Sequence, residues 1–429
     1  LPGRVTEVAD MDGTRANTWI SDSKGRNIAV IDSDGNRHSK TYDRRGNLIL
    51  ERDRADKVAV HIYDDRGHRT RTVLPTEAEL HFEWDDQDRI RAVIASNGST
   101  TIYEYVGEDR DPSRVVDPYG GVTQLEWDNG LLMRVIDPEG VSLSFAYDAY
   151  GDMISLTNAR GDVARLVRDH GGNIIESITP LGHTTRFTYD ERGIITSKTN
   201  PDGGTWVLES DDAGQLTATI DPTGARTSYF YESNGEVHQI TDPLGRVTTR
   251  DVDDIGNPSA ITLPDGDQWL FNHDGLSRLK SATDPDGGIW RYEHNETGEL
   301  VKTVDPTGVA YTVTGRPEDG SLTAIDASGE ITGTIEFDSL GRPVKGTNPQ
   351  GDAEITAYDA CGRPSEFIDA DGGLSLLKRD LAGRVISYTS PEGRTQTMGY
   401  DECGRLDTVT ASDGARTTIT YDADSRIIA

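Results

Sequence analysis

The 429-residue sequence has little of what marks disulfide-stapled domains, membrane proteins and nucleic-acid-binding proteins. Its two cysteines, Cys361 and Cys403, are too few for a disulfide framework. No run approaches the roughly 18 apolar residues that a membrane-spanning helix needs. Basic residues are fewer than acidic ones: the chain has 43 Lys and Arg and 74 Asp and Glu, which gives a net charge of −31. Such a charge repels phosphate backbones and anionic lipids, so we expect no nucleic-acid partner and no membrane insertion.

The first residues, LPGRVTEVAD, include neither an initiating methionine nor the basic-then-apolar pattern of a signal peptide. We therefore interpret the chain as an excerpt of a longer polypeptide that starts and ends in mid-repeat. The excess of acidic residues serves solubility in the simpler interpretation. In the alternative interpretation it attracts a cationic guest.

A repeat of about 21 residues runs along the whole chain. An acidic residue or its substitute returns at nearly constant spacing, with steps off by one at Asp128, Asp148 and Pro317. Glycine follows three residues later in 15 of the 20 cases. The marks are Asp22, Asp43, Asp64, Asp85, Val106, Asp128, Asp148, Asp169, Asp190, Asp211, Glu232, Asp253, Asp274, Asn295, Pro317, Asp338, Asp359, Asp380, Asp401 and Asp422. The spacing predicts one continuous array over residues 1–429 rather than several globular domains.

Each repeat is predicted to be a β-hairpin. A second glycine follows about ten residues after the first, in phrases such as DPEG and DPTG, and the two turn signals leave stretches of about six to eight residues. That length suits strands and is too short for helices. Phe187 and Tyr189 alternate with Arg186 and Thr188, which predicts one largely apolar and one polar face. We expect an all-β fold, with about 20 hairpins joined in a continuous antiparallel sheet.

The Tyr-Asp-x-x-Gly motif is interpreted as a strand end followed by a turn. The tyrosine closes a strand, the carboxylate caps backbone N–H groups of the turn, and the glycine takes a positive φ. In the second turn, Asp/Asn-Pro-x-Gly, the proline presets φ and the glycine ends the turn. The structural motif residues are Tyr42, Asp43, Gly46, Tyr63, Asp64, Gly67, Tyr147, Asp148, Gly151, Tyr189, Asp190, Gly193, Phe337, Asp338, Gly341, Tyr358, Asp359, Gly362, Tyr400, Asp401 and Gly404.

Four stretches depart from the repeat. Residues 104–121 insert a residue, residues 312–330 shift the phase, and residues 54–58 and 75–79 lack the second glycine. We interpret these stretches as bulges or altered loops in preference to binding sites.

Residues with reactive side chains fall into the repeat as well. Cys361 and Cys403 occupy the same slot two repeats apart, which predicts a separation of about 20 Å and therefore free thiols. His61 and His81 fall on second strands, while His273 and His294 occupy the tyrosine slot. None shows the spacing of a helical zinc site. We expect no catalytic residue, no cofactor site and no metal site.

Several acidic turns resemble fragments of calcium loops. They contain Asp10 and Asp12, Asp32 and Asp34, Asp284 and Asp286, and Asp369 and Asp371. The later bidentate glutamate of a calcium loop is missing at the required spacing. Hairpin turns are the simpler interpretation, and a calcium-stiffened β-solenoid stays an alternative.

Together these phrases resemble the Rhs or YD-repeat proteins. The best matches are TYDRRGNLIL, TYDERGIITSKTNPDGG, EFDSLGRPVKGTNPQG, AYDACGRPSEFIDADGG and GYDECGRLDTVTASDG, and about 20 repeats lie in phase. Similar arrays occur in toxin-complex C subunits, wall-associated surface proteins and teneurins. Bacterial relatives end their shell in a DPxGL-type segment where self-cleavage occurs. Here DPEGV and DPTGV lie within ordinary repeats, so the resemblance carries neither a cleavage site nor a toxin domain to this chain.

The resemblance implies a sheet that spirals into a hollow shell or cocoon. A ribbon of 20 hairpins would be on the order of 190 Å long, and twist favours coiling, although coiling alone does not predict a cavity. The implied function is a non-enzymatic, secreted or cell-surface shell segment of a bacterial polymorphic toxin. Its partners would be neighbouring repeats and a toxin or other cargo of the same parent chain. The alternative is an adhesion module that binds carbohydrate or protein.

Overall fold

The computed structural model describes residues 4–9, 16–233, 235–254 and 256–429, and its regular secondary structure is almost entirely β-strand. Over these residues it contains 40 strands in one sheet and one short 3-10 helix, η1 (Pro317–Asp319). Each strand runs antiparallel to the next, as β17, β18 and β19 do. The prediction of an all-β array of hairpins in a continuous antiparallel sheet is confirmed.

Each repeat supplies two strands. The first strands are β1 (Val5–Ala9), β3 (Asn27–Ile31), β5 (Leu48–Arg52), β7 (Arg69–Val73), β9 (Ile90–Ala95), β11 (Arg114–Val116), β13 (Leu131–Ile136), β15 (Met153–Thr157), β17 (Ile174–Ile178), β19 (Ile195–Thr199), β21 (Leu216–Ile220), β23 (Val237–Thr241), β25 (Pro258–Thr262), β27 (Leu279–Thr283), β29 (Leu300–Val304), β31 (Ser321–Ile325), β33 (Pro343–Thr347), β35 (Pro364–Ile368), β37 (Val385–Thr389) and β39 (Leu406–Thr410).

The second strands, most of which end on the tyrosine slot, are β2 (Ala16–Ser21), β4 (Arg37–Tyr42), β6 (Val58–Tyr63), β8 (Glu79–Trp84), β10 (Thr100–Glu104), β12 (Val122–Asp128), β14 (Ser142–Tyr147), β16 (Val163–Arg168), β18 (Thr184–Tyr189), β20 (Thr205–Ser210), β22 (Arg226–Tyr231), β24 (Val247–Val252), β26 (Gln268–His273), β28 (Ile289–His294), β30 (Ala310–Arg316), β32 (Ile331–Phe337), β34 (Ala353–Tyr358), β36 (Leu374–Arg379), β38 (Thr395–Tyr400) and β40 (Arg416–Thr418).

A register shift precedes the tyrosine slot in most repeats. Thr188 pairs with Ser197, whereas Tyr189 pairs with Ile195, so one residue of β19 is skipped. The same shift separates Gly399 from Tyr400. A bulge of this kind increases the local twist and changes the direction of the side chain beside it. The shift therefore gives the slot a geometry different from the rest of the strand.

The sheet has two faces, and neither is covered by a second layer over the described residues. Phe187 and Tyr189 are half-buried and Arg186 and Thr188 are exposed, as their alternation predicts. However, among the described residues alanines are the only apolar side chains that are fully buried, and no large side chain of these residues is more than 98% buried. Large apolar side chains such as Leu270 remain exposed on the face that we expected to be polar. Contacts along the sheet therefore replace a conventional core.

The solvent-accessible surface reflects this single layer. It measures 24848 Å² for a chain of 46.8 kDa. A compact monomer of that mass exposes roughly 16,000 Å², so the chain exposes about one and a half times the expected area.

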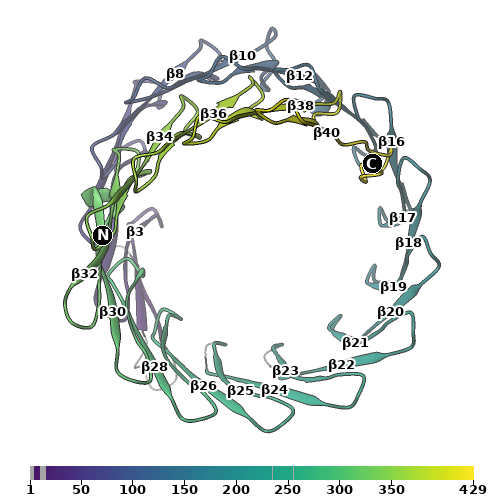
Figure 1. Cartoon of the computed structure of the whole chain (residues 1–429). Coiled ribbons are helices and arrows are strands. Elements are labelled where there is room, and N and C mark those ends of the chain that lie inside the picture. Colours follow the sequence, from purple (N-terminus) through teal and green to yellow (C-terminus); the bar gives the residue numbers. More distant parts are fainter. Residues whose placement is uncertain (1–3, 10–15, 234, 255) are drawn as a thin grey trace. The chain divides into compact units, whose positions relative to one another are not determined.

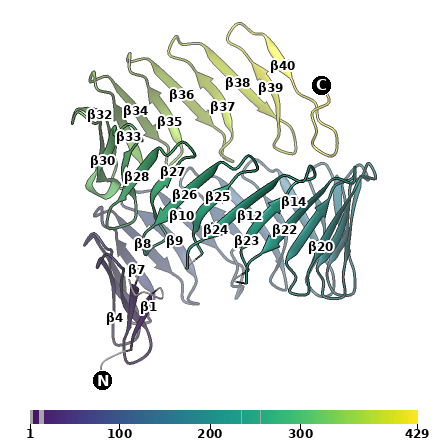
Figure 2. The same ribbon diagram turned by 90° about the horizontal axis from the view of Figure 1, so that it is seen from below.

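The described chain divides into two compact units. Each unit combines strands from an earlier part of the sequence with strands from a later part. Unit 1 comprises residues 1–84, 93–98 and 230–354, and unit 2 comprises residues 85–92, 99–229 and 355–429. Within unit 2, β16 to β21 follow one another in chain order (Figure 1). The later strands β36 to β39 form a second row of hairpins, with loops at both edges (Figure 2). We call the stretches of residues 99–229 and 355–429 the early and late courses of unit 2.

The irregular stretches contain altered loops. After β10 the chain makes a loop of residues 105–113 before the three-residue strand β11. In the irregular stretch of residues 312–330, β30 runs through Gly315 and leads into η1. Gly320, which has the left-handed αL conformation, ends that helix. Where glycine is missing, Asp56 and Glu77 take positive φ values of 64° and 67°. The prediction of a single array over residues 1–429 stays a prediction.

Candidate functional site

The Tyr-Asp turn is a compact hydrogen-bonded loop, and Asp401 illustrates it. Its Oδ1 accepts from the backbone N–H groups of Cys403 and Arg405, both at 2.9 Å. Its backbone carbonyl accepts from Gly404 at 2.9 Å. Gly404 has a φ of 76°, which a side chain would oppose. The carboxylate thus satisfies two backbone donors that a short turn would leave exposed.

All seven predicted motif triplets lie in turns of this form. Each motif glycine donates its backbone N–H to the carbonyl of its aspartate and has a positive φ. The carboxylates of Asp43, Asp64, Asp148, Asp190, Asp338 and Asp359 accept from backbone N–H groups of their own turns.

The tyrosine hydroxyl has a partner that the sequence interpretation missed. It donates to a backbone carbonyl at the start of the preceding first strand, at a constant offset along the chain. The pairs are Tyr42 to Asn27 (3.3 Å), Tyr105 to Ile90 (2.8 Å), Tyr147 to Leu132 (2.8 Å), Tyr189 to Ile174 (2.7 Å), Tyr400 to Val385 (2.7 Å) and Tyr421 to Leu406 (2.8 Å). The indole N–H of Trp84 makes the same bond to Arg69 at 2.9 Å. Phe337 has no such donor.

An arginine four residues after the aspartate completes the turn. The guanidinium of Arg405 binds Asp401 through Nε at 2.8 Å and Nη2 at 2.7 Å. Its Cζ lies 4.5 Å from the ring centroid of Tyr421, the slot residue of the next repeat. Arg26, Arg89 and Arg384 make the same contact with the next slot at 4.3–4.8 Å. In these four turns the ion pair holds the arginine against the aspartate of its own turn, and the cation–π contact ties that turn to the next repeat.

Removing one slot hydroxyl tests the contribution of this hydrogen bond. We expect Tyr189→Phe to lower the local stability of β17, β18 and β19 by about 1 kcal/mol, because the carbonyl of Ile174 loses its donor. Hydrogen exchange of these strands measures the change. Tyr311→Phe is the control, since that side chain is 58% exposed on β30. Equal effects of the two substitutions would show that the hydrogen bond from Tyr189 to Ile174 adds nothing measurable to stability.

The turn aspartates are expected to make the fold sensitive to acid. The backbone N–H of Ile194 is the main influence that holds the pKa of Asp190 below its ordinary 3.8, and it outweighs burial. The backbone N–H of Arg246 acts in the same way on the pKa of Asp242. The pKa is lowered at Asp22, Asp43, Asp64, Asp85, Asp169, Asp190, Asp221, Asp242, Asp274, Asp305, Asp326, Asp338, Asp359 and Asp401.

We expect the thermal unfolding temperature to fall steeply as the pH drops below about 4. A carboxylate whose pKa is lower in the folded state stabilises that state above its unfolded pKa. This stabilisation is lost as the pH falls through the folded pKa. Circular dichroism melts from pH 7 to pH 2 measure the effect. An unfolding temperature that stays constant between pH 5 and pH 2.5 would contradict it.

In unit 2 the turns of the late course meet those of the early course along a line that we call the seam. Glu139, in a Pro-x-Gly turn, accepts from the backbone N–H of Leu381 at 2.9 Å. The guanidinium Nε of Arg160 lies 3.7 Å from the carboxylate Oε1 of Glu402. The guanidinium of Arg363 lies 5.4 Å from the ring of Tyr119. The two partners of each pair are far apart in the sequence. Turns that follow first strands of the early course therefore contact turns that follow second strands of the late course.

The seam of unit 2 extends to Asp424, whose side chain is only 3% exposed. Its carboxylate accepts from Thr179 Oγ1 and the backbone N–H of Leu181, both at 2.9 Å. It also lies 2.6 Å from Nδ1 of His183. Burial raises the pKa of Asp424, but the three hydrogen bonds together lower that pKa by more than burial raises it. The pKa of Asp424 therefore lies below its ordinary value of 3.8.

Unit 1 has contacts of the same kind. In the turn that follows His273 and Asp274, Nη2 of Arg278 lies 2.5 Å from Oδ2 of Asp34, which belongs to a turn near the start of the chain. Lys57 pairs with Asp319 of η1. The acidic residues Asp32 and Asp34, which resemble a calcium loop, therefore serve a turn and an ion pair. Asp10 and Asp12 lie outside the described residues.

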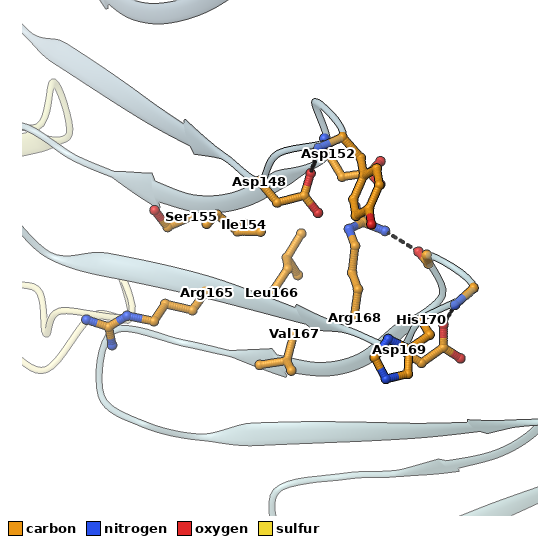
Figure 3. Close-up of a pocket in the computed structure, with 13 residues that line it drawn as sticks. Asp148, Asp152, Ile154, Ser155, Arg165, Leu166, Val167, Arg168, Asp169 and His170 are labelled. Carbon is orange, nitrogen blue, oxygen red and sulfur yellow. Dashed lines mark hydrogen bonds between the residues drawn. The ribbon is translucent and has the colours of Figure 1, made fainter.

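A pocket of about 660 Å³ opens beside the turns that follow β14 and β16 (Figure 3). Here Arg168 takes the tyrosine slot and Asp152 takes the arginine position, so the usual guanidinium-on-ring stack is missing. Arg168 instead donates to the carbonyl of Gly172 at 2.8 Å, drawn as a dashed line in Figure 3. Asp148 and Asp169 cap their own turns. Asp152, Arg165 and His170 also line the pocket and offer hydrogen bonds to a polar ligand.

The residues weighed for catalysis or metal binding are spread along the strands and turns. Cys361 and Cys403 are free, as predicted. His61 lies in β6 and His81 in β8, while His273 and His294 end β26 and β28. Within the described ranges, no group of three or more His, Cys, Asp or Glu side chains is arranged to hold a metal ion. The same part of the chain includes no helix long and apolar enough to cross a membrane.

Comparison with known proteins gives a family match and a fold match. The family model described as RHS Repeat matches residues 127–163, 168–205, 211–247, 252–289, 273–310 and 379–418. The structure described as "Crystal Structure of TcdB2-TccC3-TEV" is similar over 100% of this chain, at 14% identity and a TM-score of 0.72. The chain spans about a third of that structure's length, 32%.

The Tc holotoxin pore of Photorhabdus luminescens is similar over 96% of this chain and 30% of its own, at 14% identity and a TM-score of 0.44. A search of curated proteins finds no match.

Proposed function

The chain belongs to the RHS-repeat family, and from that premise we propose that it is a non-enzymatic segment of a β-shell that encloses and shields a polypeptide cargo. The cargo is a toxin or another domain of the same parent chain, and the assembly acts outside the cell or at its surface. The observation that carries the proposal is the single-layer sheet, whose surface is about one and a half times that of a compact protein. A sheet without a second layer suits a wall with contents on one side and solvent on the other.

The chemistry of the repeat supports a structural role. Asp401, Arg405 and Tyr421 are engaged with one another or with the backbone, so the motif serves construction of the wall. The contacts between courses in each unit give the wall lateral strength. The net charge of −31 gives it a field that attracts a cationic guest.

The test uses the intact parent polypeptide in which this array occurs. Limited proteolysis followed by mass spectrometry compares the digestion of the cargo segment with that of the turn loops, and low-resolution imaging reports the interior. We expect the cargo to resist a protease that nicks the loops, and density to lie inside the wall. Digestion of the cargo as fast as in isolation, or an empty interior, would count against enclosure.

A second candidate function is binding of carbohydrate, and the pocket beside β16 favours it. Tyr150 lines the pocket with a side chain that is 93% exposed, so its ring is not used for packing. An exposed ring beside Asp152 and Arg165 suits a neutral sugar, which stacks on the ring and hydrogen-bonds to both charges.

Saturation-transfer NMR with a panel of methyl glycosides at millimolar concentration tests this second candidate. We expect a signal that Tyr150→Ala abolishes and that Tyr311→Ala, at an exposed strand position, leaves intact. A panel without any signal, or equal loss in both variants, would eliminate it.

A further inference from the structure

The inserted loop of residues 105–113 replaces an ordinary Tyr-Asp turn of the early course. Val106 stands where other repeats have the capping aspartate, and Asp109 stands where most have the glycine. The N–H of Asp109 donates to the carbonyl of Val106 at 3.1 Å, and no aspartate caps the loop as in the ordinary turns. The chain rejoins the sheet at Ser113, whose N–H donates to the carbonyl of Glu104 at 2.8 Å. The insertion therefore builds a longer loop where other repeats have a short turn.

Side chains of the repeats on either side hold this loop in place. From the preceding repeat, Nη1 of Arg89 donates to the carbonyls of Gly107 and Asp109 at 2.9 and 2.7 Å. From the following repeat, the indole N–H of Trp127 donates to the carbonyl of Pro112 at 2.9 Å. The loop is therefore preorganised, which lowers the entropic cost of binding a ligand beside it.

A pocket of about 680 Å³ lies between this loop and the turn that follows β8. Binding sites for small molecules have volumes of roughly 300–1,000 Å³. Ile90, Tyr103 and Pro112 give the pocket an apolar wall. Tyr103 lies in β10 and is only half-buried, so part of its ring is open to a ligand. The wall therefore suits a flat apolar group that stacks on this ring.

Arg110 supplies the pocket with a cation that a ligand can reach. Arg89, which also lines the pocket, is already engaged, because it binds Asp85 through Nε and Nη2 at 2.7 Å and lies over the ring of Tyr105. Arg110 is exposed, and over the part of the chain that the structure describes its side chain forms no ion pair or hydrogen bond. The exposed amide of Gln87 adds a second polar group. A guanidinium of this kind binds a carboxylate through two parallel hydrogen bonds.

The surroundings of Arg110 disfavour a bare anion. Asp109 and Asp111 flank it in the sequence, and the net charge of −31 repels anions from the whole chain. A lone carboxylate therefore gains little from Arg110. A carboxylate attached to an aromatic ring also gains the contact with the apolar wall, which this repulsion does not weaken.

We propose that the inserted loop forms a binding site for a small aromatic carboxylate. Arg110 binds the carboxylate, Gln87 donates a further hydrogen bond to it, and the aromatic ring stacks on Tyr103. The altered loop that the sequence predicts is then a binding site as well. The site uses none of the residues of the pocket beside β16, and it does not depend on the enclosure of a cargo.

Saturation-transfer NMR on the full chain tests the site with indole-3-acetate and 4-hydroxyphenylacetate at millimolar concentrations. We expect a ring-proton signal from at least one of the two acids, and Arg110→Gln should raise its Kd at least about tenfold, because the charge-assisted hydrogen bonds are lost. Arg44→Gln is the matched control, since Arg44 is an exposed arginine of a Tyr-Asp turn in unit 1 and the change in net charge is the same. The control should leave the Kd unchanged. No signal from either acid, or equal weakening by both substitutions, would overturn the proposal.

A second measurement on the unmodified chain needs no variant. The primary carboxamide of the acid that binds keeps the ring and lacks the charge, so we expect it to bind at least about tenfold more weakly. Acetate and methyl glucuronide keep the carboxylate and lack the aromatic ring, and neither should displace the acid at equal concentration. A carboxamide that binds as tightly as the acid, or displacement by acetate or the glucuronide, would also contradict the proposal.

Discussion

Replacing Gly121 by alanine is expected to loosen the seam of unit 2 by about 1–3 kcal/mol, the usual cost of overpacking a close contact. A Cβ built on Gly121 would lie 2.5 Å from the backbone carbonyl oxygen of Leu381 and 2.9 Å from Asp117 Oδ2. The carbonyl belongs to the late course and cannot rotate away as a side chain would. The two turns must therefore separate to admit the methyl group.

Hydrogen exchange of residues 380–384 measures this loosening, and Gly346→Ala is the matched control. Gly346 lies within β33, and a Cβ there would meet nothing within 4 Å. The control should be neutral or slightly stabilising, because alanine loses less backbone entropy than glycine on folding. Unchanged protection at residues 380–384 in Gly121→Ala would show that the courses do not touch as closely in solution.

The substitution Asp401→Ala is expected to destabilise the repeat around it by about 2–4 kcal/mol, because several interactions depend on one carboxylate. The backbone N–H groups of Cys403 and Arg405 lose their acceptor. Arg405 loses its ion pair and is freed to leave the ring of Tyr421. The turn and its tie to the next repeat therefore weaken together.

Asp401→Asn separates these effects. Asn158 occupies the same position in another turn, and its Oδ1 accepts from Arg160 and Asp162 at 3.0 and 2.9 Å. We therefore expect the asparagine variant to keep the backbone caps and to lose the ion pair. Its loss of stability should be less than half of the loss in Asp401→Ala. Exchange of β38, β39 and β40 is the appropriate measurement, since repeat arrays need not unfold in one step. Equal losses in both variants would assign the whole effect to charge.

The hairpins and their turns could be predicted because every signal lies within one repeat. Tyr189, Asp190 and Gly193 return at fixed spacing, and each has a local physical role. The tyrosine hydroxyl bond and the arginine tie were missed, although each joins positions at a constant offset along the chain. The recurrent Gly-Arg after Tyr-Asp, as at Gly404 and Arg405, was the available signal.

Whether a second layer packs on either face of the β-sheet was predicted less well. Alternation of Phe187 with Arg186 and Thr188 indicated an apolar and a polar face, which usually means that something packs on the apolar one. In unit 2 the described residues leave Val167, Trp206 and Phe367 exposed on strands of both courses. Alternation reports which side chains share a face, and it does not report whether a second layer exists.

The period of the repeat, the hairpin in each period and the chemistry of both turns were determined by the sequence alone, because a strand, a carboxylate cap and a positive φ depend on close neighbours in the chain. Only the tertiary structure decided that the turn at Glu139 meets the turn at Leu381. That offset depends on the summed twist of all the strands between them, each adjusted by its bulge and its packing. Small differences per strand accumulate over a course, so the partner across the seam cannot be read from any single repeat.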